Sequence, residues 1–110
     1  MGRDGFLGEF EQMLLLAVMR LGNEAYGVRL MEELETRVGR NVSRGSVYVT
    51  LDRMEDKGWI SSELSASKPE RGGRPRRMVR VTPEGLTVLR KSRAALLDLW
   101  DGLEEALDAG

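Results

Sequence analysis

The stretch SRGSVYVTLDRMEDKG, residues 43–58, has the pattern of a single helix with a cap at each end. Ser43 can accept a hydrogen bond from an amide of the first turn, and Gly58 suits the left-handed position after the last turn. Val47, Leu51 and Met54 fall on one face at about 100° per residue. We therefore expect one narrow apolar stripe to pack inward.

The face opposite that stripe is short, polar and cationic. Its members are Arg44, Gly45, Ser46, Val49, Thr50 and Arg53. Side chains of these kinds can approach phosphates and base edges. A polar face on an isolated helix is more often simply solvated, so the neighbouring segments must decide between the two interpretations.

Two further helices are predicted ahead of this stretch. Residues 9–21 are apolar nearly all round, with Leu15, Leu16 and Met19 lying off the main stripe. Such a helix is covered on more than one side, either by its own core or by a second subunit. Residues 25–38 form the next helix, and residues 39–42 connect it tightly to Ser43, which gives the helix-turn-helix pattern. Its expected inner face holds Val28, Met31, Leu34 and Val38.

A basic loop between two short strands follows. Residues 59–64 and 78–81 are strand-like, and residues 65–77 are rich in Arg, Gly and Pro. Such a loop can extend as a wing in which cations neutralise phosphates or enter a minor groove and glycines allow close approach. The same loop could equally contact RNA. The candidate residues are Lys68, Arg71, Gly72, Gly73, Arg74, Arg76 and Arg77.

The last helix has a clear start, with Thr82 as its N-cap and Pro83 as its first residue. A helix of about 25 residues cannot bury its whole length on so small a domain. We expect its distal part to pair with a second copy of the chain; the alternative is a helix folded back on its own core. The stripe consists of Leu89, Leu96, Trp100, Leu103 and Leu107.

Length and composition narrow the classes of function. The 110 residues suit one domain, and the absence of Cys and His removes the thiolate, the commonest metal ligand and the commonest general base. Without a phosphate loop or dinucleotide fingerprint, we predict neither an enzyme nor a cofactor or metal. No apolar run approaches the ~20 residues of a membrane span, and no signal-peptide pattern is present, so a cytoplasmic location is expected.

The net charge of −1 conceals an uneven distribution. Residues 1–42 carry a balance of −2, residues 43–93 carry +6, and residues 94–110 carry −5. A basic middle between acidic ends can present a positive surface to a polyanion. The helix from Ser43 and the basic hairpin share that positive segment, which favours nucleic acid over simple solvation.

Six short motifs follow one another over residues 7 to about 90: LGEFE (7–11), EAYG (24–27), SRGSVY (43–48), TLDRMEDKG (50–58), ERGGR (70–74) and VTPEG (81–85). In this order they resemble the PadR-type transcriptional regulators, and the single short C-terminal helix is similar to the compact branch of that family. The resemblance implies a homodimeric repressor on a palindromic operator, with the helix from Ser43 in the major groove and the hairpin against the flanking backbone. Two departures are Met78-Val79, where the family often has two aromatics, and Val49, where it often has proline or a small residue.

We therefore predict a mainly α fold with a small β-hairpin, a winged helix-turn-helix plus a long dimerisation helix. Residues 1–8 would form a tail, residues 9–82 the DNA-binding domain and residues 83–110 the dimerisation helix. Ser46, Thr50 and Arg53 are the first base-edge candidates. The recognition-helix set is Ser43, Arg44, Gly45, Ser46, Tyr48, Val49, Thr50 and Arg53, and Tyr26 joins the wing residues as a backbone contact. Packing is an equally good role for Tyr26 and Tyr48.

Two other functions fit parts of the pattern. A sensor could hold a small hydrophobic or aromatic effector at the dimer interface beside Trp100, although a Trp at heptad spacing is more often interface core. The predicted interface or pocket residues are Leu14, Leu15, Val18, Leu96, Trp100, Leu103 and Leu107. Alternatively, a winged helix without an operator could bind RNA or another protein.

Overall fold

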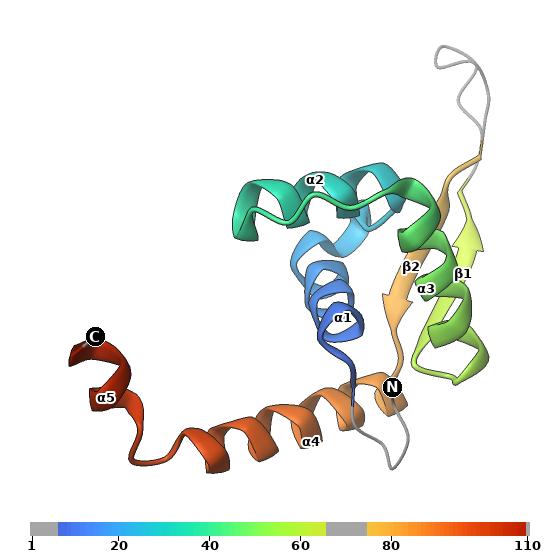
Figure 1. Ribbon diagram of the computed structural model, residues 1–110. Helices are drawn as coiled ribbons and strands as arrows, with labels where there is room; N and C mark the ends of the chain where they lie inside the picture. Colours follow the sequence, from blue (N-terminus) through green and yellow to red (C-terminus); the bar gives the residue numbers. More distant parts are fainter. Residues whose placement is uncertain (1–6, 66–74, 110) are drawn as a thin grey trace.

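The structure is a computed structural model that describes residues 7–65 and 75–109. In these residues three α-helices and one short 3-10 helix precede a two-stranded hairpin, and two further α-helices follow it (Figure 1). The elements are α1 (Glu9–Leu21), the short 3-10 helix η2 (Gly22–Glu24), α2 (Gly27–Val38), α3 (Arg44–Asp56), β1 (Ile60–Leu64), β2 (Arg77–Val81), α4 (Pro83–Trp100) and α5 (Glu104–Ala109).

The hairpin is antiparallel, with Ile60 opposite Val81 and Leu64 opposite Arg77. Its second strand also contacts the first half of the chain, because the Val79 amide donates to the Ala25 carbonyl oxygen at 2.9 Å. Both α1 and α3 pack against the hairpin. This arrangement is a winged helix-turn-helix and confirms the predicted fold class.

One apolar core joins the helices to the hairpin. Leu14 and Leu15 of α1, Leu30 of α2 and Val79 of β2 are almost completely buried in it. The predicted stripe of α3 is confirmed, because Val47, Leu51 and Met54 are fully buried. Burying a side chain such as Leu51 contributes about 1.5–3 kcal/mol, so the stripe holds α3 firmly to the domain.

The predicted inner face of α2 is partly wrong. Val28 and Val38 are 42% and 52% exposed. Leu34 is buried as predicted, and Leu30, which was not predicted, is buried as well. The helix begins only at Gly27, after an extended Tyr26. Val28 lies two positions before Leu30, about 200° around the helix, and so points away from the core.

The C-terminal helix is not continuous, contrary to the prediction. It ends at Trp100, because Asp101 leaves the helical conformation with a ψ of 124° and Gly102 takes a positive φ of 83°. Left-handed φ is easily adopted by glycine, and the chain turns there before α5. Only the start of α4 packs on the domain, and the rest extends away as an arm (Figure 1). No helix in the described ranges is long and apolar enough to cross a membrane.

Candidate nucleic-acid interface

The exposed face of α3 begins at a well-formed cap. The Ser43 hydroxyl oxygen accepts a hydrogen bond from the Ser46 amide at 3.0 Å, as the sequence predicts. Five of the six outward residues are exposed, namely Arg44, Gly45, Ser46, Val49 and Arg53. This face of the helix lies opposite the buried stripe and exposes cations, a hydroxyl group and a small apolar side chain.

Thr50 is the exception among the six residues predicted to face outward. It is only 6% exposed, because it follows Val47 by three positions and precedes Met54 by four, so it lies at the edge of the buried stripe. Its predicted position on the outward face is therefore wrong. Ser46 and Arg53 remain exposed base-edge candidates.

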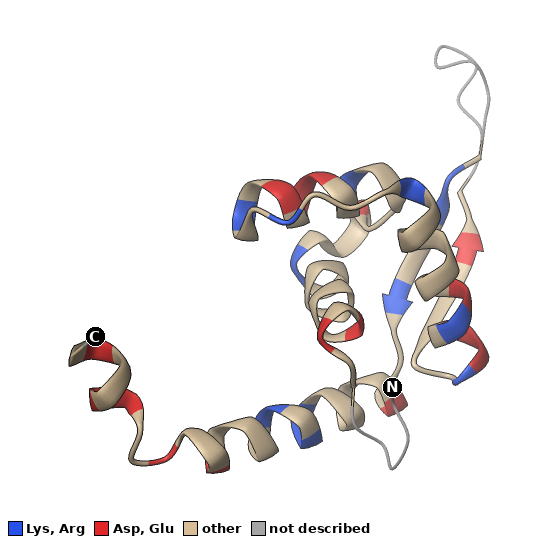
Figure 2. Ribbon diagram, viewed as in Figure 1, with Lys and Arg blue, Asp and Glu red and all other residues tan. Residues whose placement is uncertain are grey.

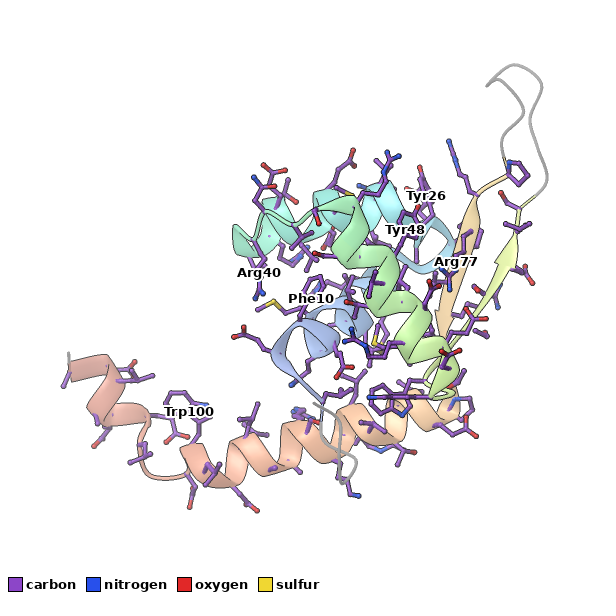
Figure 3. The ribbon with its side chains drawn as sticks, turned by 45° about the vertical axis from the view of Figure 1, so that its right-hand side comes forward. Phe10, Tyr26, Arg40, Tyr48, Arg77 and Trp100 are labelled. Atoms are coloured by element: carbon purple, nitrogen blue, oxygen red, sulfur yellow. The ribbon has the colours of Figure 1, made fainter. Side chains whose placement is uncertain are left out.

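A groove of about 530 Å³ runs beside this face. One wall is α3, with Ser43, Ser46, Val49 and Arg53, and the other contains Phe10 and the turn around Arg40. The Arg40 guanidinium lies 5.4 Å from the centre of the Phe10 ring and donates to Glu9 Oε1 at 3.0 Å (Figure 3). Arg40 was not among the predicted site residues. Its position in the turn just before the Ser43 cap could have indicated that it lies beside the recognition helix.

Tyr26 and Tyr48 lie close together where α2 meets α3 (Figure 3). The Tyr48 hydroxyl occupies the space that a side chain at Gly27 would need, so Tyr48 packs on the start of α2. The Arg76 guanidinium lies 4.5 Å from the centre of the Tyr26 ring. This contact holds the exposed base of the wing beside the helix-turn-helix.

Arg77 contacts protein acids, which its predicted role as a phosphate contact did not anticipate. Its Nη1 donates to Asp52 Oδ1 at 2.8 Å and its Nη2 to Glu55 Oε1 at 2.6 Å. The Ser62 hydroxyl also donates to Glu55 Oε1, at 2.7 Å. Hydrogen bonds from Ser62 and then Arg77 lower the pKa of Glu55 below its ordinary value of 4.5. Arg77 thus ties the wing to the acidic side of α3, and its side chain is only 23% exposed.

Several predicted wing residues fall outside the described ranges: Lys68, Arg71, Gly72, Gly73 and Arg74. Arg76 lies at the edge of the described chain and is exposed. The charge distribution of the described part is shown in Figure 2, where basic residues occur on α3 and β2 and acidic residues dominate the end of the arm.

The residues predicted to form a dimer interface or an effector pocket fall into two groups. Leu14, Leu15 and Val18 are at most 3% exposed, because α2, α3, α4 and β2 of the same chain cover α1. Their assignment to a dimer interface or effector pocket is therefore wrong. The other members lie on the arm and are exposed, at 46% for Leu96, 40% for Trp100, 52% for Leu103 and 63% for Leu107.

The fold and this polar helix face define a winged-helix regulator, and comparison with known proteins identifies the family. Residues 15–91 match the transcriptional regulator PadR-like family. The chain belongs to that family, as its motifs indicate. Its members are transcriptional regulators rather than enzymes, which confirms the prediction that this chain is not an enzyme.

Individual relatives agree with this result. The chain is 42% identical over 77 residues to the transcriptional regulator Rv3488 of Mycobacterium tuberculosis, covering 70% of this chain and 67% of that protein. A PadR family regulator from Eggerthella lenta is 30% identical, with a TM-score of 0.66 and coverage of 93% and 88% of the two chains. A PadR-like regulator from Bacillus cereus is 26% identical, also with a TM-score of 0.66, over 91% and 88%.

Proposed function

We propose that this regulator is a sequence-specific repressor that binds a palindromic DNA operator as a homodimer. The exposed polar face of α3 carries the proposal, because a fully buried stripe on the other side fixes the helix to the domain. Ser46 and Arg53 would contact base edges, and Val49 would contact a thymine methyl group. A helix so mounted, with its N-terminal residues outward, has the geometry of a recognition helix in a major groove.

The residues around α3 suggest that some side chains recognise the DNA sequence and that others hold the protein on the phosphates. Arg44, Arg40 and the exposed Arg76 surround α3 on the side of its N-terminus and on the wing. Cations of this kind bind phosphates without reading sequence, and each phosphate contact releases counterions. Asp52 and Glu55 lie nearer the C-terminal end of α3 and face the hairpin, where Arg77 partly neutralises them. We also propose a division of the chain. Residues 1–8 are a tail, residues 9–82 form the DNA-binding domain and residues 83–110 form the dimerisation segment.

Selection of bound duplexes from a random pool at fixed salt tests this function. We expect a palindrome whose half-sites are about 10–10.5 base pairs apart, or a multiple of that spacing, since each protomer of a dimer would place one α3 in the groove. Arg53→Ala should relax the preference at one position of each half-site by about 1–3 kcal/mol. The exposed Arg80, on the hairpin, offers a matched control in Arg80→Ala, which should leave the preference intact.

Two results would contradict the proposal. Failure to enrich any duplex, together with retention of single-stranded or structured RNA, would favour the RNA-binding alternative. Enrichment of a sequence without two-fold symmetry would leave DNA binding in place and remove the homodimer. Repression itself is tested by placing the selected site between a promoter and a reporter gene, where the chain should lower expression.

We also propose that a small hydrophobic or aromatic effector releases the operator by binding beside Trp100. The position of Trp100 supports this proposal, because the residue is 40% exposed and lies on the arm, away from the domain (Figure 3). Replacing the buried Trp59 by Phe isolates the Trp100 fluorescence. Quenching by planar aromatic compounds, accompanied by loss of operator binding, is expected; no quenching across a broad panel would leave Trp100 as interface core.

A further inference from the structure

Arg40 lies in the turn between α2 and α3, yet its backbone is anchored to the domain. Its amide donates to the Leu34 carbonyl oxygen at 3.1 Å, and the preceding Gly39 takes a positive φ of 69°. A left-handed glycine followed by an amide that bonds back into the last helical turn is a common cap of a helix C-terminus. Because Leu34 is buried, this cap fixes the backbone of Arg40 relative to the core.

The side chain of Arg40 is held by the first turns of α1. Its Nη1 donates to Glu9 Oε1 at 3.0 Å and to Met13 Sδ at 3.8 Å. The guanidinium carbon lies 5.4 Å from the centre of the Phe10 ring (Figure 3). Phe10 packs partly buried against the core, so its ring is a fixed surface beside the cation. The ring and the two acceptors together favour one orientation of the guanidinium.

This orientation leaves one edge of the guanidinium without a partner. Both hydrogen bonds use Nη1, and within the described residues Nε and Nη2 of Arg40 donate to no acceptor. These two nitrogens form one edge of a planar group and can donate in parallel to two oxygens of a phosphate. The side chain is 40% exposed and borders the same groove as Ser46 and Arg53 of α3.

We propose that Arg40 binds a DNA phosphate beside the recognition helix through its Nε and Nη2 edge, and that Phe10 and Glu9 position it for this contact. The inference rests on the DNA binding proposed above and adds α1 to the interface. An exposed ion pair contributes little to stability, and Glu9 is 76% exposed, so this pair mainly orients Arg40. A side chain that is already held loses less conformational freedom when it binds a ligand.

The salt dependence of binding to the selected duplex tests the phosphate contact on the full chain. Arg40→Ala should lower the slope of log affinity against log salt concentration by about 0.9 for each protomer bound. The affinity lost between about 50 and 200 mM salt then becomes about threefold smaller per protomer. The base preference should not change, because a phosphate contact carries no sequence information. The matched control is Arg37→Ala, at an exposed position of α2 outside the residues that line the groove; it should keep the wild-type slope.

A double-mutant cycle tests the positioning by Phe10. Phe10→Leu keeps an apolar side chain and removes the ring, so it should weaken DNA binding about threefold when Arg40 is present and not at all in the Arg40→Ala background. Equal weakening in both backgrounds would overturn the positioning role. If Phe10→Leu alters the circular dichroism spectrum, Arg40→Lys decides instead. It keeps the charge but not the planar edge, so it should keep the salt slope and bind about threefold more weakly; wild-type affinity would overturn the proposed orientation.

The outcomes separate this inference from the proposed function. If no duplex is selected, the proposed DNA binding fails and the role of Arg40 fails with it. If a duplex is selected and Arg40→Ala keeps both the affinity and the salt slope of the wild type, the phosphate contact is overturned while DNA binding stands.

Discussion

The helices α3 and α4 each carry an apolar stripe at helical spacing, but the stripe of α3 is buried and most of the stripe of α4 is exposed. All three stripe residues of α3 are fully buried in their own domain. On α4, Leu89 is 8% exposed, whereas Leu96 and Trp100 are 46% and 40% exposed. Periodicity therefore predicts that a face is apolar, but the length of the helix relative to its domain decides whether the same chain covers it.

The largest expected difference between the two helices is in stability. Leu51→Ala would leave a cavity in a closed core and should lower the free energy of unfolding by about 2–5 kcal/mol. Leu99→Ala, on the arm, should change it by less than about 0.5 kcal/mol. Urea unfolding at low protein concentration measures both. Equal effects would show that the arm is packed on its own domain, contrary to the structure.

The joint between domain and arm is the next most sensitive point. A Cβ at Gly85, in the first turn of α4, would collide with the backbone carbonyl of Trp59. Gly85→Ala should therefore cost about 1–3 kcal/mol through overpacking, although alanine is the better helix former. Gly45→Ala, in the first turn of α3, is the matched control because a Cβ there meets open space. It should be neutral or slightly stabilising; a similar loss at both positions would contradict the close contact at Gly85.

The contrast also shows what can be predicted from sequence. The cap at Ser43, the stripe of α3 and the start of α4 at Thr82 are local features, and the structure has all of them. The contacts of Arg77 with Asp52 and Glu55 join residues more than twenty positions apart, and no local pattern specifies them. The break at Gly102 was missed because the leucine spacing continues through it, while the burial of Leu14 depends on how many elements surround α1.

A smaller effect is expected at the contact between wing and recognition helix. Arg77→Gln should lower the free energy of unfolding by about 1 kcal/mol, because it removes two charge-assisted hydrogen bonds from a mostly covered side chain. Arg80→Gln, on the same strand but exposed, should have almost no effect. If Arg77 positions the wing and does not contact a phosphate, DNA binding by the Arg77→Gln variant should keep a salt dependence near the wild-type slope. A slope reduced by about one unit would instead assign Arg77 to a phosphate.

The smallest predicted effect is a pH dependence of the same contact. Ser62 and Arg77 lower the pKa of Glu55 below 4.5 in the folded chain, so the folded state favours the carboxylate more than the unfolded state does. The resulting stabilisation is complete above the unfolded pKa and disappears as the pH falls through the lower, folded pKa.

Glu55→Gln isolates this contribution, because glutamine keeps the size of the side chain and cannot titrate. The difference in unfolding free energy between wild type and variant should be constant above about pH 5 and should shrink as the pH falls below about 4.5. Urea titrations at a series of pH values measure it, and Glu63→Gln, at an exposed position on β1, controls for the loss of a surface charge. A difference that persists unchanged at pH 3 would mean that Glu55 joins α3 to the wing through shape alone, leaving Asp52 as the charged partner of Arg77.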